Sequence, residues 1–204
     1  MAPIVGVIIA YLAGSIPSAY LAGKLKGVDL RQHGSGNLGA TNVVRVLGPK
    51  IGAVVFLVDL LKGFLPVYFL PMYTETLRPG MWALVYGVAA IAGHVKPIFL
   101  LGKGGGKGVA TASGVFMALA LVPMLIAQAV WITVFYFTRY VSLASLCGAI
   151  VLPIAILALY HDPRSPVFIA SVIIASFVFW THRANIGRLR RGEEHRFVKK
   201  EAAS

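Results

Sequence analysis

The segment Ser35–Arg45 (SGNLGATNVVR) combines residue types that could bind a phosphate group. Its glycines allow the backbone to approach a ligand closely, and its backbone N–H groups and hydroxyls are donors for phosphate oxygens. Arg45, at its end, carries a planar guanidinium that suits bidentate contact with phosphate. The segment therefore predicts a phosphate-binding loop, and the alternative is a Gly/Asn turn between two helices.

A second candidate is the segment Gly102–Thr111 (GKGGGKGVAT), which leads directly into an apolar stretch. Glycines and lysines at the start of a helix predict an anion site, because the unpaired amides and the helix dipole favour negative charge there. It is not a Walker A loop, since Leu101 stands where the first glycine belongs and Gly108 stands where Ser or Thr should follow Lys107. The alternative is a flexible basic turn at a membrane surface.

Two further polar segments are Arg139–Ser145 (RYVSLAS) and His182–Glu194 (HRANIGRLRRGEE). On a helix, His182 and Asn185 would share one face. The alternative for His182–Glu194 is a polybasic stretch that is attracted to anionic lipid.

The composition indicates what kind of protein must position these segments. Of the 204 residues, 58% are hydrophobic and 13% are charged, and the net charge is +12. Soluble domains carry about 25% charged residues, and a nucleic-acid binder would place its basic excess on a more polar chain. A cationic excess on an apolar chain is typical of a multi-spanning membrane protein that obeys the positive-inside rule. The fold class predicted is an all-α integral membrane protein.

The apolar stretches are Ile4–Leu21, Ile51–Leu70, Met81–Leu101, Val109–Thr138, Leu143–Tyr160 and Val167–Thr181. Most have about the 20 residues that cross the hydrocarbon core, but the fourth is too long for one ordinary span. Pro123 could divide it into two. Two crossings there, with the N-terminus outside, gather most cations on one side: Lys24, Lys26, Arg31, Arg45, Lys50, Lys103, Lys107, Arg139, Arg183, Arg188, Arg190, Arg191, Arg196, Lys199 and Lys200. We therefore predict seven spans with the N-terminus out and the C-terminus in; the alternative is six spans with a tilted fourth.

This topology places the four polar segments on the cytoplasmic side of one domain, residues 1–204, within segments 24–50, 102–111, 139–145 and 182–204. The sequence thus predicts a site for an anionic, phosphorylated ligand at the cytoplasmic membrane surface. Within the spans, Asp59 and Lys62 lie three residues apart and can neutralise each other, so we interpret them as a structural pair. His94 fits helix-end packing or a chemical role equally well. Cys147, the single cysteine, excludes an internal disulfide and predicts an inert thiol.

Together the four segments, in this order, resemble the bacterial acyl-phosphate:glycerol-3-phosphate acyltransferases of the PlsY family, and the resemblance covers nearly the whole chain. It implies a seven-span inner-membrane enzyme that transfers a fatty acyl group from acyl phosphate to the sn-1 hydroxyl of glycerol 3-phosphate. The products would be lysophosphatidic acid and phosphate, used in phospholipid biosynthesis. The chain departs from the family's glycine loop at Gly102, which replaces an aromatic residue, and has one extra glycine between Lys103 and Lys107.

The resemblance also implies roles for individual residues. For glycerol 3-phosphate the matched positions are Ser35, Arg45, Lys107, His182 and Asn185, and for acyl phosphate they are Asn37, Thr41, Gly105, Gly106, Gly108 and Ser142. Catalysis would involve His182, Asn185 and Lys107 without a conventional nucleophile, with His182 acting as a base or orienting the substrate. We expect no cofactor, no metal and no nucleic acid; membrane lipid surrounds the protein, and a monomer is favoured. The alternative function is an anion transporter or lipid-binding scaffold that uses the same basic face.

Overall fold

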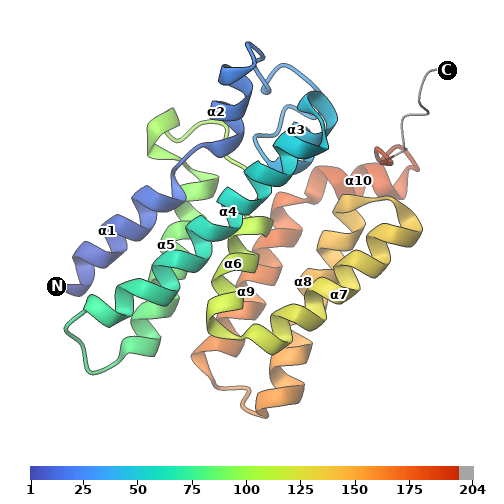
Figure 1. Ribbon diagram of the computed structural model, residues 1–204. Helices are drawn as coiled ribbons and strands as arrows, with labels where there is room; N and C mark the ends of the chain where they lie inside the picture. The colour runs from blue at the N-terminus through green and yellow to red at the C-terminus, as the bar shows by residue number, and fades with distance from the viewer. Residues whose placement is uncertain (198–204) are drawn as a thin grey trace. The chain divides into compact units, whose positions relative to one another are not determined.

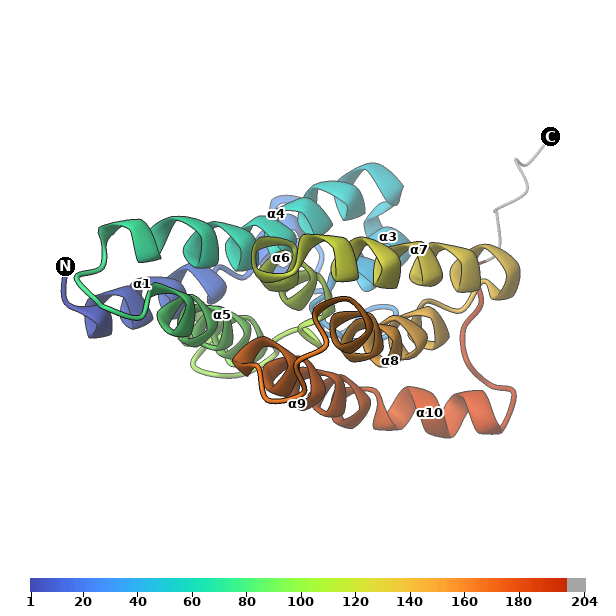
Figure 2. The same cartoon turned by 90° about the horizontal axis from the view of Figure 1, so that it is seen from below.

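The computed structural model describes residues 1–197, and these form helices, turns and loops without a β-strand. The chain divides into two compact units, Met1–Leu121 and Val122–Ser204. Figures 1 and 2 show the helices of each unit. The end of the predicted segment 182–204, with Lys199 and Lys200, lies outside the described residues.

The first unit is built around one long central helix. Its helices are α1 (Pro3–Gly14), α2 (Ser18–Leu25), α3 (Ala40–Leu47), α4 (Pro49–Phe69), α5 (Pro79–Val95) and α6 (Val109–Leu119), with short 3-10 helices η1 (Leu70–Tyr73) and η2 (Ile98–Leu100). The helix α4 packs against α1, α3, α5 and α6, and α1 also packs along α5 (Figure 1). The two phosphate-binding segments predicted in this unit thus lie next to helices that pack on α4.

Glycines bring the backbones of α4 and α6 close together. A Cβ atom at Gly63 would collide with the carbonyl oxygen of Thr111, and one at Gly114 would collide with that of Leu60. In a membrane, where lipid is as apolar as Leu, helices associate through such close backbone contacts between small residues. The contact holds α6 in a defined position along α4. The segment Gly102–Gly108, called the glycine loop below, immediately precedes α6.

The second unit contains α7 (Leu121–Thr138), α8 (Val141–Tyr160), α9 (Pro166–Thr181) and α10 (Arg183–Arg190), with α7 beginning at the boundary residue Leu121. The indole Nε1 of Trp131 on α7 donates to Ser145 Oγ on α8 at 3.2 Å. Helix α8 packs against α9, and α10 contacts both. At the end of α9 the chain bends into α10 (Figure 1), and the bend between the two helices is 60°.

Five helical segments of the described chain are long and apolar enough to cross a bilayer: Pro3–Leu25, Pro49–Tyr73, Pro79–Leu100, Leu121–Thr138 and Val141–Tyr160. The bent pair α9–α10 is a sixth if its two helices are counted as one span, and α6 is a shorter apolar helix. The protein is therefore a multi-pass membrane protein. Its seven-span count and orientation remain predictions.

Two apolar stretches are interrupted. The stretch Val109–Thr138 divides as predicted, but at Ala120, whose backbone (φ −151°, ψ 67°) is not helical. Pro123 then falls in the first turn of α7, where its missing N–H costs no helical hydrogen bond. The stretch Ile4–Leu21, expected to be continuous, is broken between α1 and α2, because Pro17 has no N–H with which to continue the helix.

Candidate active site

The first predicted segment is held by a buried amide that the sequence analysis did not single out. Asn42 on α3 is 1% exposed. Its Oδ1 accepts from the backbone N–H of Ser35 at 2.8 Å, and its Nδ2 donates to the carbonyls of Leu30 at 3.1 Å and His33 at 3.0 Å. A fully bonded, buried amide fixes the backbone it contacts. It therefore ties the loop that carries Ser35 to the helix that carries Arg45.

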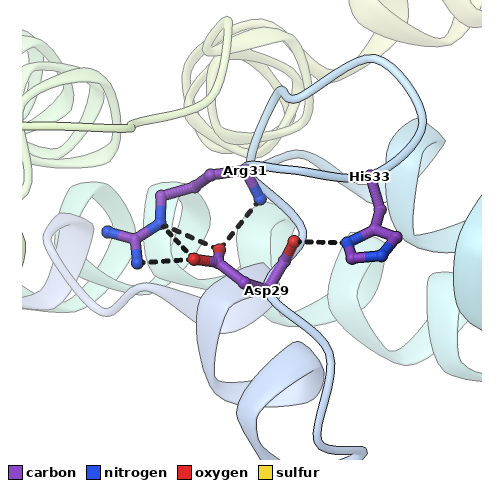
Figure 3. Close-up of polar contacts among 3 residues, drawn as sticks. All are labelled: Asp29, Arg31 and His33. Carbon is purple, nitrogen blue, oxygen red and sulfur yellow. Dashed lines mark hydrogen bonds and ion pairs between the residues drawn. The ribbon is translucent and has the colours of Figure 1, made fainter.

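The start of the same loop is closed by an ion pair (Figure 3). Arg31 Nη2 lies 2.8 Å from Asp29 Oδ2, and the guanidinium is 5.4 Å from the ring centre of Tyr20. The Nδ1 atom of His33 donates to the carbonyl of Asp29 at 2.9 Å. Hydrogen bonds from the Arg31 side chain and backbone lower the pKa of Asp29 to about 2. The charge of Arg31 is thus neutralised within the loop by Asp29.

The glycine loop needs glycine for its turns. Gly102, Gly104 and Gly108 have φ values of 72°, 72° and 83°, which side-chain-bearing residues rarely adopt. Gly108 immediately precedes α6, so the predicted helix N-terminus is confirmed. Its first amides have no partner within the helix and favour an anion there. Lys107 adds a positive charge next to this N-terminus.

Gly105 and Gly106 are required for close packing on the end of α5. A Cβ at Gly105 would collide with the carbonyl oxygen of Val95, and one at Gly106 would collide with Nε2 of His94. The N–H of Gly106 donates to the carbonyl of His94 at 3.3 Å. The two glycines therefore serve contact with α5, in addition to any contact with a ligand.

The predicted pair of charges on α4 is confirmed. Lys62 Nζ lies 2.7 Å from Asp59 Oδ1, and the two residues are 6% and 1% exposed. Lys62 also donates to the carbonyl of Ile16 at 2.9 Å, and Ser18 Oγ donates to Asp59 Oδ1 at 2.6 Å. At the break between α1 and α2 the Ile16 carbonyl accepts from the N–H of Ser18 at 3.0 Å as well as from Lys62.

In the second unit, a carboxylate brings two predicted site residues together. Glu194 Oε1 accepts from Ser142 Oγ at 2.8 Å and from Asn185 Nδ2 at 2.6 Å, and Oε2 accepts from Arg188 Nε at 2.7 Å. Burial raises the pKa of Glu194, but these three hydrogen bonds outweigh it and leave the pKa below its ordinary value. The sequence analysis gave Glu194 no role; its one signal was an acidic residue at the end of a cationic segment.

His182 lies between α9 and α10 and is 4% exposed. Its Nδ1 is 2.8 Å from the carbonyl oxygen of Val178, which can only accept, so Nδ1 carries the proton. In the neutral ring the lone pair then lies on Nε2. Asn185 follows three residues later in α10, consistent with the shared face that was predicted.

The predicted site residues fall into both units. Ser35, Asn37, Thr41, Arg45, Gly105, Gly106, Lys107 and Gly108 belong to the first, and Ser142, His182 and Asn185 belong to the second. The convergence of all four segments on one face stays a prediction. Within residues 1–197, no group of three or more His, Cys, Asp or Glu side chains is placed to hold a metal ion.

Comparison with known proteins decides the family. Residues 4–192 match the glycerol-3-phosphate acyltransferase family. The chain belongs to this family. The resemblance noted from the four sequence segments is thereby confirmed.

Members of the family are similar over almost the full length. The glycerol-3-phosphate acyltransferase of Trichlorobacter lovleyi is 47% identical over 188 residues, covering 92% of this chain and 94% of its own. That of Aquifex aeolicus is 45% identical over 194 residues, covering 94% and 97%. The crystal structure of the integral membrane acyltransferase PlsY in its glycerol 3-phosphate form has a TM-score of 0.87 at 41% identity and covers 96% of each chain. The lysophosphatidic acid form has a TM-score of 0.84 at 40% identity, covering 96% of this chain and 95% of its own.

Proposed function

We propose that this protein transfers a fatty acyl group from acyl phosphate to the sn-1 hydroxyl of glycerol 3-phosphate, with lysophosphatidic acid and phosphate as products. The observation that carries the proposal is the similarity, over 96% of the chain, to an acyltransferase solved in forms with glycerol 3-phosphate and with lysophosphatidic acid. Substrate and product of one reaction are thus associated with the same fold at about 40% identity.

We assign the phosphate of glycerol 3-phosphate to Arg45, Ser35 and Lys107. The support in the first unit is the hydrogen bonding of Asn42, which ties the Ser35 loop to the helix of Arg45. A guanidinium and a hydroxyl on one fixed segment can contact several phosphate oxygens at once. From the second unit, the assignment adds His182 and Asn185.

The phosphate of the acyl donor is assigned to Gly105, Gly106 and Gly108 at the N-terminus of α6, with Asn37, Thr41 and Ser142. An acyl phosphate is already activated, so binding and charge stabilisation suffice without a covalent acyl-enzyme. The sn-1 hydroxyl oxygen attacks the acyl carbonyl carbon, the bond from that carbon to the phosphate oxygen breaks, and the hydroxyl proton ends on the released phosphate. No cofactor takes part in this sequence.

His182 is assigned to the attacking hydroxyl. With Nδ1–H bonded to Val178, a neutral ring directs its lone pair from Nε2, which can accept the hydroxyl hydrogen. The same lone pair serves orientation or general-base catalysis. A base would make kcat fall as the imidazole is protonated, and an orienting group would show its effect in the KM for glycerol 3-phosphate.

We further propose that residues 1–204 form one domain with seven spans, the N-terminus outside and the C-terminus inside, in the inner membrane of a bacterium. The support is the excess of cations on one predicted side and the family match, which runs through both units from residue 4 to 192. The active site would then face the cytoplasm, and the protein would act as a monomer.

The test is a phosphate-release assay with the purified full chain in lipid nanodiscs, using palmitoyl phosphate as donor. We expect release that depends on glycerol 3-phosphate and equals the lysophosphatidic acid formed. Binding of both anions without release would instead support the transporter or scaffold. The internal neutralisation of Asp59 by Lys62 argues against the polar path that a transporter needs.

A further inference from the structure

Next to the glycine loop, four polar side chains from three helices form a cluster. These are Ser18 of α2, Asp59 and Lys62 of α4, and His94 of α5; the last three are 1%, 6% and 6% exposed. Asp59 is the centre, because Oδ1 accepts from Lys62 at 2.7 Å and from Ser18 at 2.6 Å. His94 Nδ1 lies 3.6 Å from the same oxygen.

His94 connects this cluster to the glycine loop. Its carbonyl accepts from the N–H of Gly106, and its ring lies so close to Gly106 that a Cβ there would collide with Nε2. A cavity of about 10 Å³ lies between the cluster and the loop, lined in part by Ser18, Lys62, His94, Gly104, Gly105 and Gly106. This volume is about that needed for one water molecule, so the loop rests almost directly on the cluster.

The His94 side chain is buried, and its Nδ1 has no partner within hydrogen-bond distance among the described residues. Asp59 is the nearest charged acceptor, and a shift of a few tenths of an ångström would complete the hydrogen bond. The carboxylate is already held by Lys62 and Ser18. We therefore expect His94 to make the shift that completes the contact, and the glycine loop, which bonds to the carbonyl of His94, to follow it.

Stability alone is a weak reason to bury this cluster. A buried ion pair is often no more stabilising than apolar residues of similar volume. A loop with five glycines, in contrast, has little preference of its own for one conformation. Donors that bind a phosphate tightly must be held in place before it arrives.

We propose that Asp59, Lys62 and His94 are positioning residues that fix the glycine loop, and that they thereby set the affinity for the phosphate of the acyl donor. The inference rests on the proposed function, in which Gly105, Gly106 and Gly108 bind that phosphate. Lys62 and Ser18 hold Asp59, Asp59 orients His94, and His94 supports Gly106. In this proposal the three side chains act on the loop and do not contact the substrate.

The first test compares two variants of His94 in the phosphate-release assay. His94→Phe keeps an aromatic ring, although a larger one, and loses both nitrogens and with them the polar contact with Asp59. We expect the KM for palmitoyl phosphate to rise about tenfold. The KM for glycerol 3-phosphate should rise less. His94→Asn retains a donor near the position of Nδ1 and should recover part of the donor affinity.

The second test separates positioning from folding. The double variant Asp59→Leu/Lys62→Met removes both buried charges, so the thermal stability should stay near that of the wild type. We expect its KM for palmitoyl phosphate to be about tenfold above that of the wild type, as for His94→Phe. The matched control is Tyr86→Phe on α5, the helix of His94. This variant loses a buried contact of 2.8 Å to Thr74, away from the loop. It should reduce stability without changing the KM for the donor.

The outcomes are distinguishable. If the wild type releases phosphate but the His94 and double variants keep its KM for palmitoyl phosphate, the positioning role is wrong while the function stands. The same holds if Tyr86→Phe raises that KM as much as they do. If the wild type releases no phosphate, the proposed function itself fails.

Discussion

Replacing Asn42 tests whether one buried amide holds the candidate phosphate loop. Its side chain makes three hydrogen bonds of 2.8 to 3.1 Å to the backbone of residues 30–35. At about 1 kcal/mol for each neutral hydrogen bond, Asn42→Ala should cost about 3 kcal/mol. If the whole of this free energy had stabilised the closed loop, the KM for glycerol 3-phosphate should rise by up to about a hundredfold.

Asn42→Asp is the sharper variant. Its Oδ1 can still accept from the N–H of Ser35, but its second oxygen would face the carbonyls of Leu30 and His33, which are also acceptors. The aspartate should therefore be at least as damaging as alanine at neutral pH. Protonation supplies one donor, so low pH should restore part of its thermal stability relative to the alanine variant.

The assay measures the KM for each substrate and the thermal unfolding of the full chain in nanodiscs. Gln32→Ala is the matched control, because this exposed polar residue lies in the same loop. It should match the wild type in both measurements. An Asn42→Asp protein with wild-type stability and wild-type KM for glycerol 3-phosphate at neutral pH would refute the reasoning.

Three further predictions concern the rest of the site. Arg45→Ala should raise the KM for glycerol 3-phosphate at least about thirtyfold, while the KM for palmitoyl phosphate changes little. Arg45→Lys should recover only part of the affinity for glycerol 3-phosphate, because lysine lacks the planar guanidinium. The opposite pattern would assign Arg45 to the acyl-phosphate site. The pKa of Glu194 is lower in the folded chain than its ordinary value of 4.5, so its contribution to stability should be complete above that pH and be lost as the pH falls through the folded value; Glu194→Gln should flatten this dependence in pH-dependent unfolding. In a Cys147→Ser background, Arg164→Cys should react with an impermeant thiol reagent from outside and Gly192→Cys only after the membrane is opened; labelling of both from one side would contradict the topology.

Much of the helical framework can be predicted from hydropathy alone. The stretch Leu143–Tyr160 corresponds to α8, Val141–Tyr160, and Ile51–Leu70 corresponds closely to α4, Pro49–Phe69. The physical reason is that hydrocarbon offers no hydrogen bonds to the backbone, so an apolar stretch of this length must satisfy its own amides as a helix. The Asp59–Lys62 pair was equally accessible, since a spacing of three residues brings side chains together on any helix.

The sequence motifs also determined the family, because their residue types are unusual in a chain otherwise made of apolar helices. They did not determine what holds each motif in place. Ser142 and Glu194 bond across 52 residues, and His94 meets Asp59 from another helix. Periodicity along the chain describes one helix at a time and carries no information on which helices pack together.

Only the tertiary structure therefore assigned Asn42, Glu194 and His94 their places. Asn42 and Glu194 bond to partners in a different loop or helix, and burial makes those partners necessary, because an unbonded polar group inside the protein is costly. His94 lies 3.6 Å from Asp59 of another helix. The sequence predicts which segments bind phosphate. The packing of the helices decided which buried side chains hold those segments in shape.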